Sequence, residues 1–174
     1  SDSLICISGG YGGLFTVDPF DISRHVNHLG EFNQSQPVDN ITVMDSILYA
    51  SKGTDGMLIM NVSQLERPQI LNFYGTTIRD LKVEGGYVLY TGYNSFIVAD
   101  LTNPAEPDNI VWLESEGRPR GVCIEGSFAY TSGDEGGLTI YNIEDPEEII
   151  ETGHVYIADD HNDVVVDDDF AYLA

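Results

Sequence analysis

The chain has 174 residues, and 29 Asp and Glu against 7 Lys and Arg give it a formal net charge of −22. Apolar residues make up 42% of the sequence, enough to form the core of a folded protein of this length. The acidic excess argues against a nucleic acid partner, because phosphate binding requires a basic surface. No apolar run reaches the roughly 18–20 residues of a membrane-spanning helix, so we expect no integral membrane segment.

A short pattern that usually begins with tyrosine recurs along the chain at steps of 43, 41, 40 and 42 residues. Its copies begin at Cys6, Tyr49, Tyr90, Tyr130 and Tyr172. The apolar segments before and after each tyrosine recur at the same spacing as the tyrosines, an agreement that rarely arises by chance. Antiparallel units at a spacing of about 40–45 residues are typical of the blades of a β-propeller.

Each repeat contains segments with the length and composition of β-strands, rich in Val, Ile, Tyr, Phe and Thr and bounded by turn residues. In chain order, the predicted strands are 4–8, 13–18, 26–32, 41–43, 49–51, 56–61, 69–74, 81–83, 90–92, 95–100, 109–113, 122–124, 130–132, 137–142, 152–157, 164–166 and 170–174. Helical spacing is limited to at most one turn at 145–151.

The connections between these segments follow the same repeat. Tight turns are predicted between the first and second strands of each sheet, at 45–46, 85–86, 126–127 and 168–169. Longer loops that contain proline, at 62–68 and 101–107, separate the third and fourth strands. We therefore predict an all-β fold, a β-propeller built of four-stranded antiparallel blades.

The repeats define the expected domain organisation, which is a single β-propeller region over 1–174. The predicted repeats are 4–46, 47–86, 87–127 and 128–169, and the start of a further blade lies at 170–174. A ring of six to eight such blades would need about 250–330 residues. We therefore expect the four blade-lengths present here to be part of a larger ring.

The best-defined repeat resembles a known family. Arg120-Gly-Val-Cys-Ile-Glu-Gly-Ser-Phe-Ala-Tyr130 is followed by Gly136-Gly-Leu-Thr-Ile-Tyr-Asn142, Ile143 and Pro146. This pattern is similar to the LVIVD repeat, in which Gly-Val-x-Val leads to Tyr-x-Ala, then to Gly-Leu-x-Ile-x-Asp and an Asp-Pro or Asn-Pro turn. The resemblance covers essentially the whole chain and is loosest in the first repeat, where Cys6 replaces tyrosine. It implies a propeller-like protein, exported or at the cell surface of bacteria or archaea, and no catalytic motif.

Propeller topology places the loops after the second and fourth strands on one face, at the mouth of the central channel, where propellers usually bind ligands. Four residues occupy equivalent positions there, two before each inner strand: Asp39, Arg79, Arg120 and Asn162. Loops after the second strands add further candidates, among them Tyr93 and Asp134. We predict a ligand-binding site from these six residues and no catalytic residue.

Arg79 and Arg120 are notable because basic residues are so rare in this chain. Two guanidinium groups can hold a carboxylate or an anionic sugar through paired hydrogen bonds. The alternative is that the two arginines form ion pairs with Asp80, Glu116 or Asp39 and hold adjacent blades together. The sequence leaves both possibilities open.

An acidic segment near the end of the chain raises the question of a metal ion. Asp159, Asp160 and Asp163 are candidate Ca²⁺ ligands, because Ca²⁺ prefers oxygen ligands of this kind. The spacing of an EF-hand is missing, however, and aspartate also favours turns for local reasons. We expect no cofactor other than this candidate Ca²⁺ ion.

Two functions of different kinds remain, beside a purely architectural role in a cell-surface layer, which would involve no small ligand. The first is a non-catalytic, extracellular or cell-surface propeller that binds other surface proteins or a glycan, as an accessory surface lipoprotein of an outer-membrane uptake complex. The second is a carbohydrate-active hydrolase or lyase with a carboxylate pair at the channel mouth. The sequence contains no Gly-x-Ser-x-Gly, P-loop or Rossmann motif, which favours the first.

Overall fold

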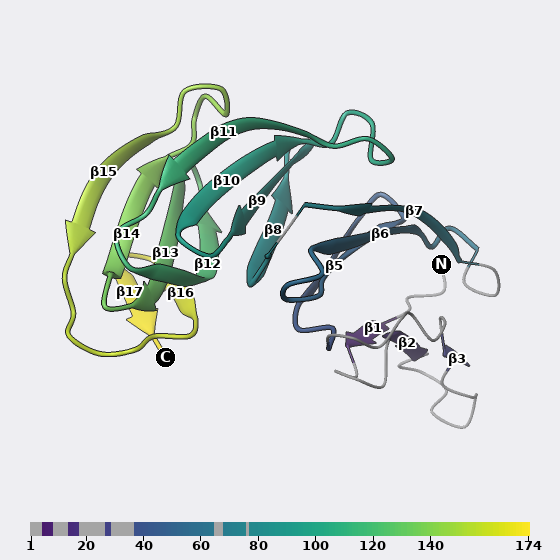
Figure 1. The fold of residues 1–174 in the computed structure, drawn as a ribbon, viewed down its shortest axis with the longest axis horizontal. Coiled ribbons are helices and arrows are strands. Elements are labelled where there is room, and N and C mark those ends of the chain that lie inside the picture. Colours follow the sequence, from purple (N-terminus) through teal and green to yellow (C-terminus); the bar gives the residue numbers. More distant parts are fainter. Residues whose placement is uncertain (1–4, 9–13, 18–26, 29–36, 65–67, 76) are drawn as a thin grey trace. The chain divides into compact units, whose positions relative to one another are not determined.

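The computed structural model describes all residues except 1–4, 9–13, 18–26, 29–36, 65–67 and 76. The described residues form seventeen β-strands and no helix (Figure 1). Accordingly, no helix capable of crossing a membrane is found among them. The chain divides into two compact units, Ser1–Thr77 and Ile78–Ala174.

The first unit, unit 1, contains two antiparallel sheets. Its three-stranded sheet consists of β1 (Ile5–Ser8), β2 (Leu14–Val17) and β3 (Asn27–His28). Its four-stranded sheet has the order β4 (Ile41–Met44), β5 (Ile47–Ser51), β6 (Met57–Asn61) and β7 (Gln69–Tyr74). The middle strands β5 and β6 supply most of the buried apolar side chains, because both of their faces are covered.

The second unit, unit 2, contains two four-stranded sheets and one two-stranded sheet. One blade has the order β8 (Asp80–Glu84), β9 (Tyr87–Thr91), β10 (Ser95–Asp100) and β11 (Asp108–Glu114). The next has the order β12 (Arg118–Glu125), β13 (Phe128–Asp134), β14 (Gly137–Asn142) and β15 (Ile150–Val155). The last sheet pairs β16 (Val164–Asp167) with β17 (Phe170–Leu173).

Two-residue turns connect the first and second strands of the sheets, as predicted. Both residues of the β4–β5 turn, Asp45 and Ser46, have positive φ angles of 48° and 67°. The β8–β9 turn uses Gly85 and Gly86 at 59° and 88°. Positive φ at both central positions is the geometry that matches the right-handed twist of a hairpin. The same turn geometry is therefore reached once with glycines and once without them.

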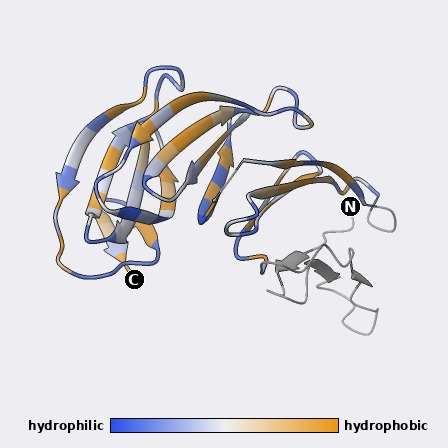
Figure 2. Cartoon of the chain, viewed as in Figure 1, coloured by the Kyte–Doolittle hydropathy of each residue, from blue (hydrophilic) through white to orange (hydrophobic). Residues whose placement is uncertain are grey.

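The two blades of unit 2 share a buried apolar layer. Phe96 of β10 stacks on Tyr141 of β14, with ring centroids 4.6 Å apart and planes inclined by 17°. Val98, Val122 and Ile149 belong to the same cluster and are buried. In Figure 2 the middle strands β9 and β10 carry mostly apolar colours, whereas β15 and most of the turns and loops of this unit carry polar or pale ones. The packing of one blade on the next thus removes the second sheet face from water.

Polar groups also connect these blades. The Oδ2 atom of Asp80, a residue only 6% exposed, accepts a hydrogen bond from the amide of Val122 at 2.8 Å. The Thr91 hydroxyl donates to the carbonyl oxygen of Arg120 at 2.9 Å. Gly121 has no room for a side chain, because a Cβ there would lie 2.7 Å from the Cα of Asp163. The inner strands β8, β12 and β16 therefore approach one another closely.

The predicted all-β class, the four-stranded antiparallel blades and nearly all strand positions are confirmed. The prediction of a strand at 152–157 is wrong by two residues, because a register shift after Ile140 lets β15 begin at Ile150, opposite Asn142. Residues 145–151 form no helix; Asp145 instead caps a turn by accepting the Glu147 amide at 3.0 Å. Of the strand predicted at 26–32, the structure has β3, and the remaining residues lie outside the described ranges.

Candidate functional site

The alternating direction of the strands gives each sheet of unit 2 two distinct ends. We call the loop end of unit 2 the residues 78–79, 92–94, 115–117, 135–136 and 156–163, which precede the inner strands or follow the second strands. We call the turn end the residues 85–86, 101–107, 126–127 and 143–149. The predicted site residues of this unit lie in or beside the loop end.

Three of the seven basic residues of the chain lie in the loop end or directly beside it: Arg79 precedes β8, and Arg118 and Arg120 are among the first residues of β12. Arg120 is held by a carboxylate: its Nη2 donates to Asp134 Oδ2 at 2.7 Å, and its Nε lies 2.5 Å from Oδ1. Its Nη1 donates to Asn162 Oδ1 at 3.0 Å. Arg120 therefore connects β13 of its own blade to the segment before β16, and the structure unites three of the predicted site residues.

This arrangement decides how Arg120 is paired. The expected partners were Asp80, Glu116 or Asp39, and the partner in the structure is Asp134. Asp80 is unsuitable because its carboxylate is turned inward, where Oδ1 accepts the Leu81 amide at 2.8 Å and Oδ2 accepts that of Val122. The expected ion pair of Arg120 with Asp80, Glu116 or Asp39 is not formed: its carboxylate partner lies in its own blade, and it contacts the next sheet only through the hydrogen bond to Asn162.

The other two arginines lie against an aromatic ring instead. The guanidinium carbons of Arg79 and Arg118 lie 6.0 and 5.1 Å from the ring centroid of Tyr93. Neither arginine forms an ion pair with a carboxylate of the described residues. The Nε atom of Arg79 is buried, and no hydrogen-bond partner for it lies within that part of the chain. The Tyr93 ring remains 54% exposed, so this arginine pair borders an accessible aromatic surface.

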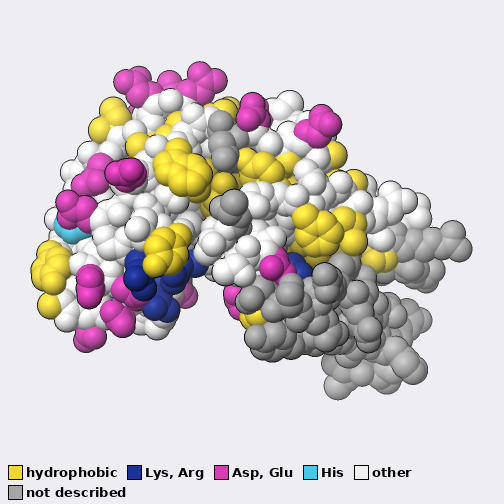
Figure 3. All heavy atoms as spheres, viewed as in Figure 1, with side chains coloured by type: hydrophobic (Ala, Val, Ile, Leu, Met, Phe, Trp, Pro, Cys, Tyr) yellow, Lys and Arg dark blue, Asp and Glu magenta, His cyan; other side chains and the backbone are white. Residues whose placement is uncertain are grey.

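The three arginines at the loop end act together on one carboxyl group, that of Asp134. The hydrogen bond from Arg120 holds the pKa of the Asp134 carboxyl below its ordinary value, and the charges of Arg79 and Arg118 act in the same direction. The same hydrogen bond raises the pKa of Arg120. One carboxylate thus faces three guanidinium groups. Figure 3 shows basic side chains gathered in one place on the visible face of unit 2, with acidic side chains around them.

A cleft of about 450 Å³ opens beside these charges. It is lined by Asn94, Ser115, Gly117, Arg118, Asp134, Glu135 and Asp160. Gly117 has a φ of +74°, and a Cβ there would lie 2.4 Å from the Asp134 carbonyl oxygen. Only glycine lets the chain turn into β12 so close to the end of β13. The cleft is polar, and Arg118, which has no ion-pair partner among the described residues, lies there beside the carboxylates of Asp134, Glu135 and Asp160.

The sequence did not single out Arg118, although a signal was present. In Arg118-Pro119-Arg120 the two arginines are separated by one residue, and alternate residues of a strand share a face. Pro119 between them is buried. The pattern thus indicated a second guanidinium group on the exposed side of the same strand.

Two other predicted sets have a different outcome. Asp39 belongs to unit 1, where its amide donates to the Ser51 carbonyl at 3.1 Å and loss of hydration raises the pKa of its carboxyl. A ring of all four equivalent positions therefore stays a prediction.

Asp159, Asp160 and Asp163 do not come together as a metal site, and within the described ranges no group of three His, Cys, Asp or Glu side chains could hold an ion. Asp159 and Asp163 accept the amides of Asp160 and Val164 instead.

Solved structures that resemble the chain support its fold. A protein of unknown function from Desulfotomaculum acetoxidans DSM 771 matches with a TM-score of 0.76 at 16% identity, over 100% of this chain and 60% of that one. The computationally designed Ika8 protein matches with a TM-score of 0.73 at 10% identity, over 99% of this chain and 52% of that one. The designed Ika4 protein matches with a TM-score of 0.62 at 9% identity, over 80% and 85%. The chain spans about half of the length of Ika8, and identities this low bear on the fold alone.

A search of curated protein sequences gave no match. The model of the LVIVD repeat matches residues 75–110, which include β8 to β10 and the start of β11, and residues 116–156, which include the whole blade β12–β15. These are the segments in which the sequence pattern was clearest. Residues 75–110 and 116–156 therefore match the LVIVD repeat, and the four-stranded sheets of the chain are propeller-like blades.

Proposed function

We propose that this protein is a non-catalytic binding module whose loop end in unit 2 holds the carboxylate groups of an acidic glycan. The observation that carries the proposal is the pair Arg79 and Arg118, two guanidinium groups without ion-pair partners in the described part of the chain, beside the exposed ring of Tyr93. In a chain with only seven basic residues, two guanidinium groups beside one ring form a place at which an anion can bind.

The geometry suits a sugar acid. Guanidinium groups bind carboxylates through two parallel hydrogen bonds, and an exposed aromatic ring offers a flat apolar surface to a sugar ring. Asn94 and Ser115 line the adjoining cleft and supply polar groups for hydroxyls. Asp134 already saturates Arg120, which leaves the other two arginines for a ligand.

A purely binding role is also favoured by the state of Asp134. A glycosidase needs one carboxyl group with a raised pKa to act as the acid. The ion pair with Arg120 has the opposite effect on Asp134 and makes it a poor proton donor. We therefore propose binding without turnover.

The test is binding to immobilised glycans that carry carboxylates, compared with their neutral counterparts. We expect retention of the acidic glycans only, and a loss of affinity of about tenfold each for Arg79→Gln and Arg118→Gln. Lys82→Gln removes one positive charge from the middle of β8 and is the matched control, expected to bind like the original chain. The proposal would be contradicted if neutral glycans bound as tightly as acidic ones. It would also be contradicted if the arginine variants bound acidic glycans as tightly as the original chain does.

Two outcomes separate the alternatives. Release of sugar from a bound glycan would establish the hydrolase or lyase in place of the binding module. Retention of an acidic surface protein without any glycan would move the ligand from sugar to protein while leaving the arginine site in place.

A cell-surface location, as an accessory lipoprotein of an outer-membrane uptake complex, is the second part of the proposal. It rests on the resemblance to LVIVD-repeat proteins and on the acidic composition. Digestion of intact producing cells with an added protease tests it: the full-length product should be cleaved without lysis. Protection until lysis would refute a surface location.

A further inference from the structure

A second pocket of opposite character lies at the turn end of unit 2. It has a volume of about 270 Å³ and lies between the two complete blades of this unit. One blade supplies Glu84, Gly85, Tyr87, Leu89 and Val98, and the next supplies Gly126, Ser127, Ile143, Glu144, Pro146 and Ile149. No residue of this pocket belongs to the arginine site.

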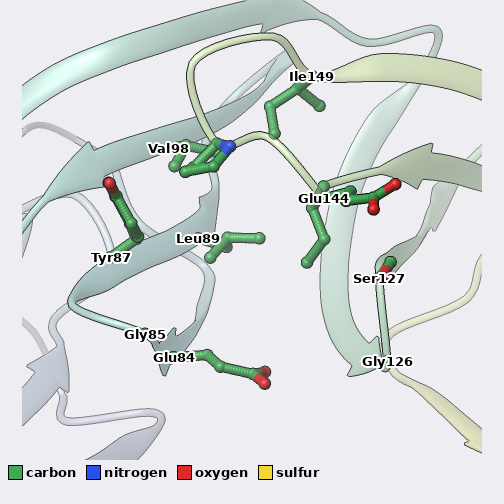
Figure 4. Close-up of a pocket in the computed structure, with 11 residues that line it drawn as sticks. Glu84, Gly85, Tyr87, Leu89, Val98, Gly126, Ser127, Glu144 and Ile149 are labelled. Atoms are coloured by element: carbon green, nitrogen blue, oxygen red, sulfur yellow. The ribbon is translucent and has the colours of Figure 1, made fainter.

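The floor of the pocket is apolar. Leu89, Val98 and Ile149 are buried members of the layer between the blades, and Tyr87 and Ile143 pack against that layer. Figure 4 shows Leu89 in the middle of the pocket, Ile149 above it and Tyr87 at its side. An apolar group that enters here would extend the contact surface of the existing core.

The rim of the pocket is acidic. Glu84 ends β8 directly before the Gly85–Gly86 turn, and Glu144 follows β14; both are exposed. In Figure 4 the side chain of Glu84 extends below Leu89 toward the Gly126–Ser127 turn, and that of Glu144 lies above Ser127. No Lys or Arg lines the pocket. The combination of an apolar floor and two carboxylates selects against anions and favours a cation with an apolar body.

We propose that this pocket binds a small organic ammonium ion, whose apolar body covers Leu89, Val98 and Ile149 and whose charged group lies beside Glu84 and Glu144. The volume restricts the ligand to a short alkyl or single-ring amine, because larger ligands usually occupy pockets of roughly 300–1,000 Å³. The small contact area predicts a dissociation constant of about millimolar.

Titration followed by amide NMR shifts tests the proposal with hexylammonium, 1-hexanol and hexanoate, three probes with the same alkyl chain and different charge. We expect hexylammonium to give saturable shifts at Gly85, Gly126 and Ser127, hexanol to bind several times more weakly, and hexanoate to give none. Glu84→Gln and Glu144→Gln should each weaken hexylammonium binding about threefold. Glu125→Gln removes an exposed carboxylate that does not line the pocket and is the matched control.

A blocking variant completes the test. Ser127→Phe places a ring over the pocket at an exposed turn position without a positive φ, so folding should be retained while saturable binding is lost. Equal affinity for hexanol and hexylammonium, unchanged binding by both glutamine variants, or no saturable shift at these amides would each overturn the proposal. Arg118→Gln should bind hexylammonium normally, so the outcome is independent of the arginine site.

Discussion

The two ends of the blades in unit 2 have opposite chemistry. At the loop end, three guanidinium groups surround one carboxylate beside an exposed tyrosine ring. At the turn end, two glutamates border an apolar pocket that no basic residue lines. The three arginines of this unit thus lie at one end of the strands, among carboxylates, and the other end has no Lys or Arg. Net charge alone describes neither end, because a ligand responds to the groups within a few ångströms of it.

The largest expected effect comes from the bond that joins the blades between these two ends. Asp80→Ala leaves the buried amides of Leu81 and Val122 without their carboxylate acceptor, and we expect the free energy of unfolding to fall by about 3 kcal/mol. Urea denaturation measures the change. Asp163→Ala is the matched control, because that exposed aspartate accepts only the amide of Val164 and should cost about 1 kcal/mol. Equal losses would show that Asp80 does not link the blades.

A pair of glycines compares the two ends directly. Gly117→Ala at the loop end combines a positive φ with a 2.4 Å approach to a carbonyl oxygen, and should destabilise the fold by about 2 kcal/mol. Gly85→Ala at the turn end has a φ of +59° but open space around it, so about 1 kcal/mol is expected. Thermal unfolding of both variants distinguishes crowding from backbone strain. If Gly85→Ala were the more damaging, the close approach at Gly117 would be irrelevant.

The turn end and the strands were predictable because their signals are local. Alternating apolar residues and the Asp45–Ser46 and Gly85–Gly86 turns recur within each repeat, so a short window of sequence identifies them. The last strand of a blade was harder to place: Thr152 is left without a partner in the pairing of β14 with β15, and the start of β15 depends on this register shift.

The loop-end site was predictable only in part because it depends on register. Arg118 lies directly opposite Asp134, and a register shift between Pro119 and Gly121 leaves Arg120 as an extra residue in β12. Such a bulge redirects a side chain, and here both Nε and Nη2 of Arg120 reach the same aspartate. The sequence indicated that Arg120 is one of few basic residues at this position of the blades. Its partner could not be predicted, because a shift of one residue in the pairing of β12 with β13 would have placed another side chain beside it.

The ion pair at the loop end should make stability depend on pH in a defined range. The folded-state pKa of Asp134 lies below its ordinary value of 3.8, so its contribution is complete at higher pH and is lost as pH falls below about 4. At neutral pH, Asp134→Asn should destabilise the protein by less than about 1 kcal/mol, because the pair is partly exposed.

Urea unfolding between pH 7 and pH 2 measures the difference in the free energy of unfolding between the original chain and Asp134→Asn. The gap between the original chain and Asp134→Asn should narrow in the acid range. A gap that is constant with pH would mean that the carboxylate charge makes no contribution.

The smallest effects on stability should come from removing single exposed charges at either end. Arg118→Gln and Glu144→Gln should each change the free energy of unfolding by less than about 0.5 kcal/mol. The binding affinities should nevertheless respond separately. Arg118→Gln should lower the affinity for the acidic glycan only, and Glu144→Gln should lower the affinity for hexylammonium only. Parallel calorimetric titrations measure both. A variant that weakened both ligands would show that the two ends are coupled rather than independent.

The stacked rings of Phe96 and Tyr141 make the contact between the blades optically visible. The single tryptophan of the chain, Trp112, is 59% exposed on the outer strand β11, so its emission reports on the periphery of the blade. Tyr141 is only 1% exposed, and burial raises the pKa of its hydroxyl. Separation of the two sheets would place that phenol in water while Trp112 changed little. Near-ultraviolet circular dichroism of tyrosine, rather than tryptophan fluorescence, is the signal that should follow blade separation.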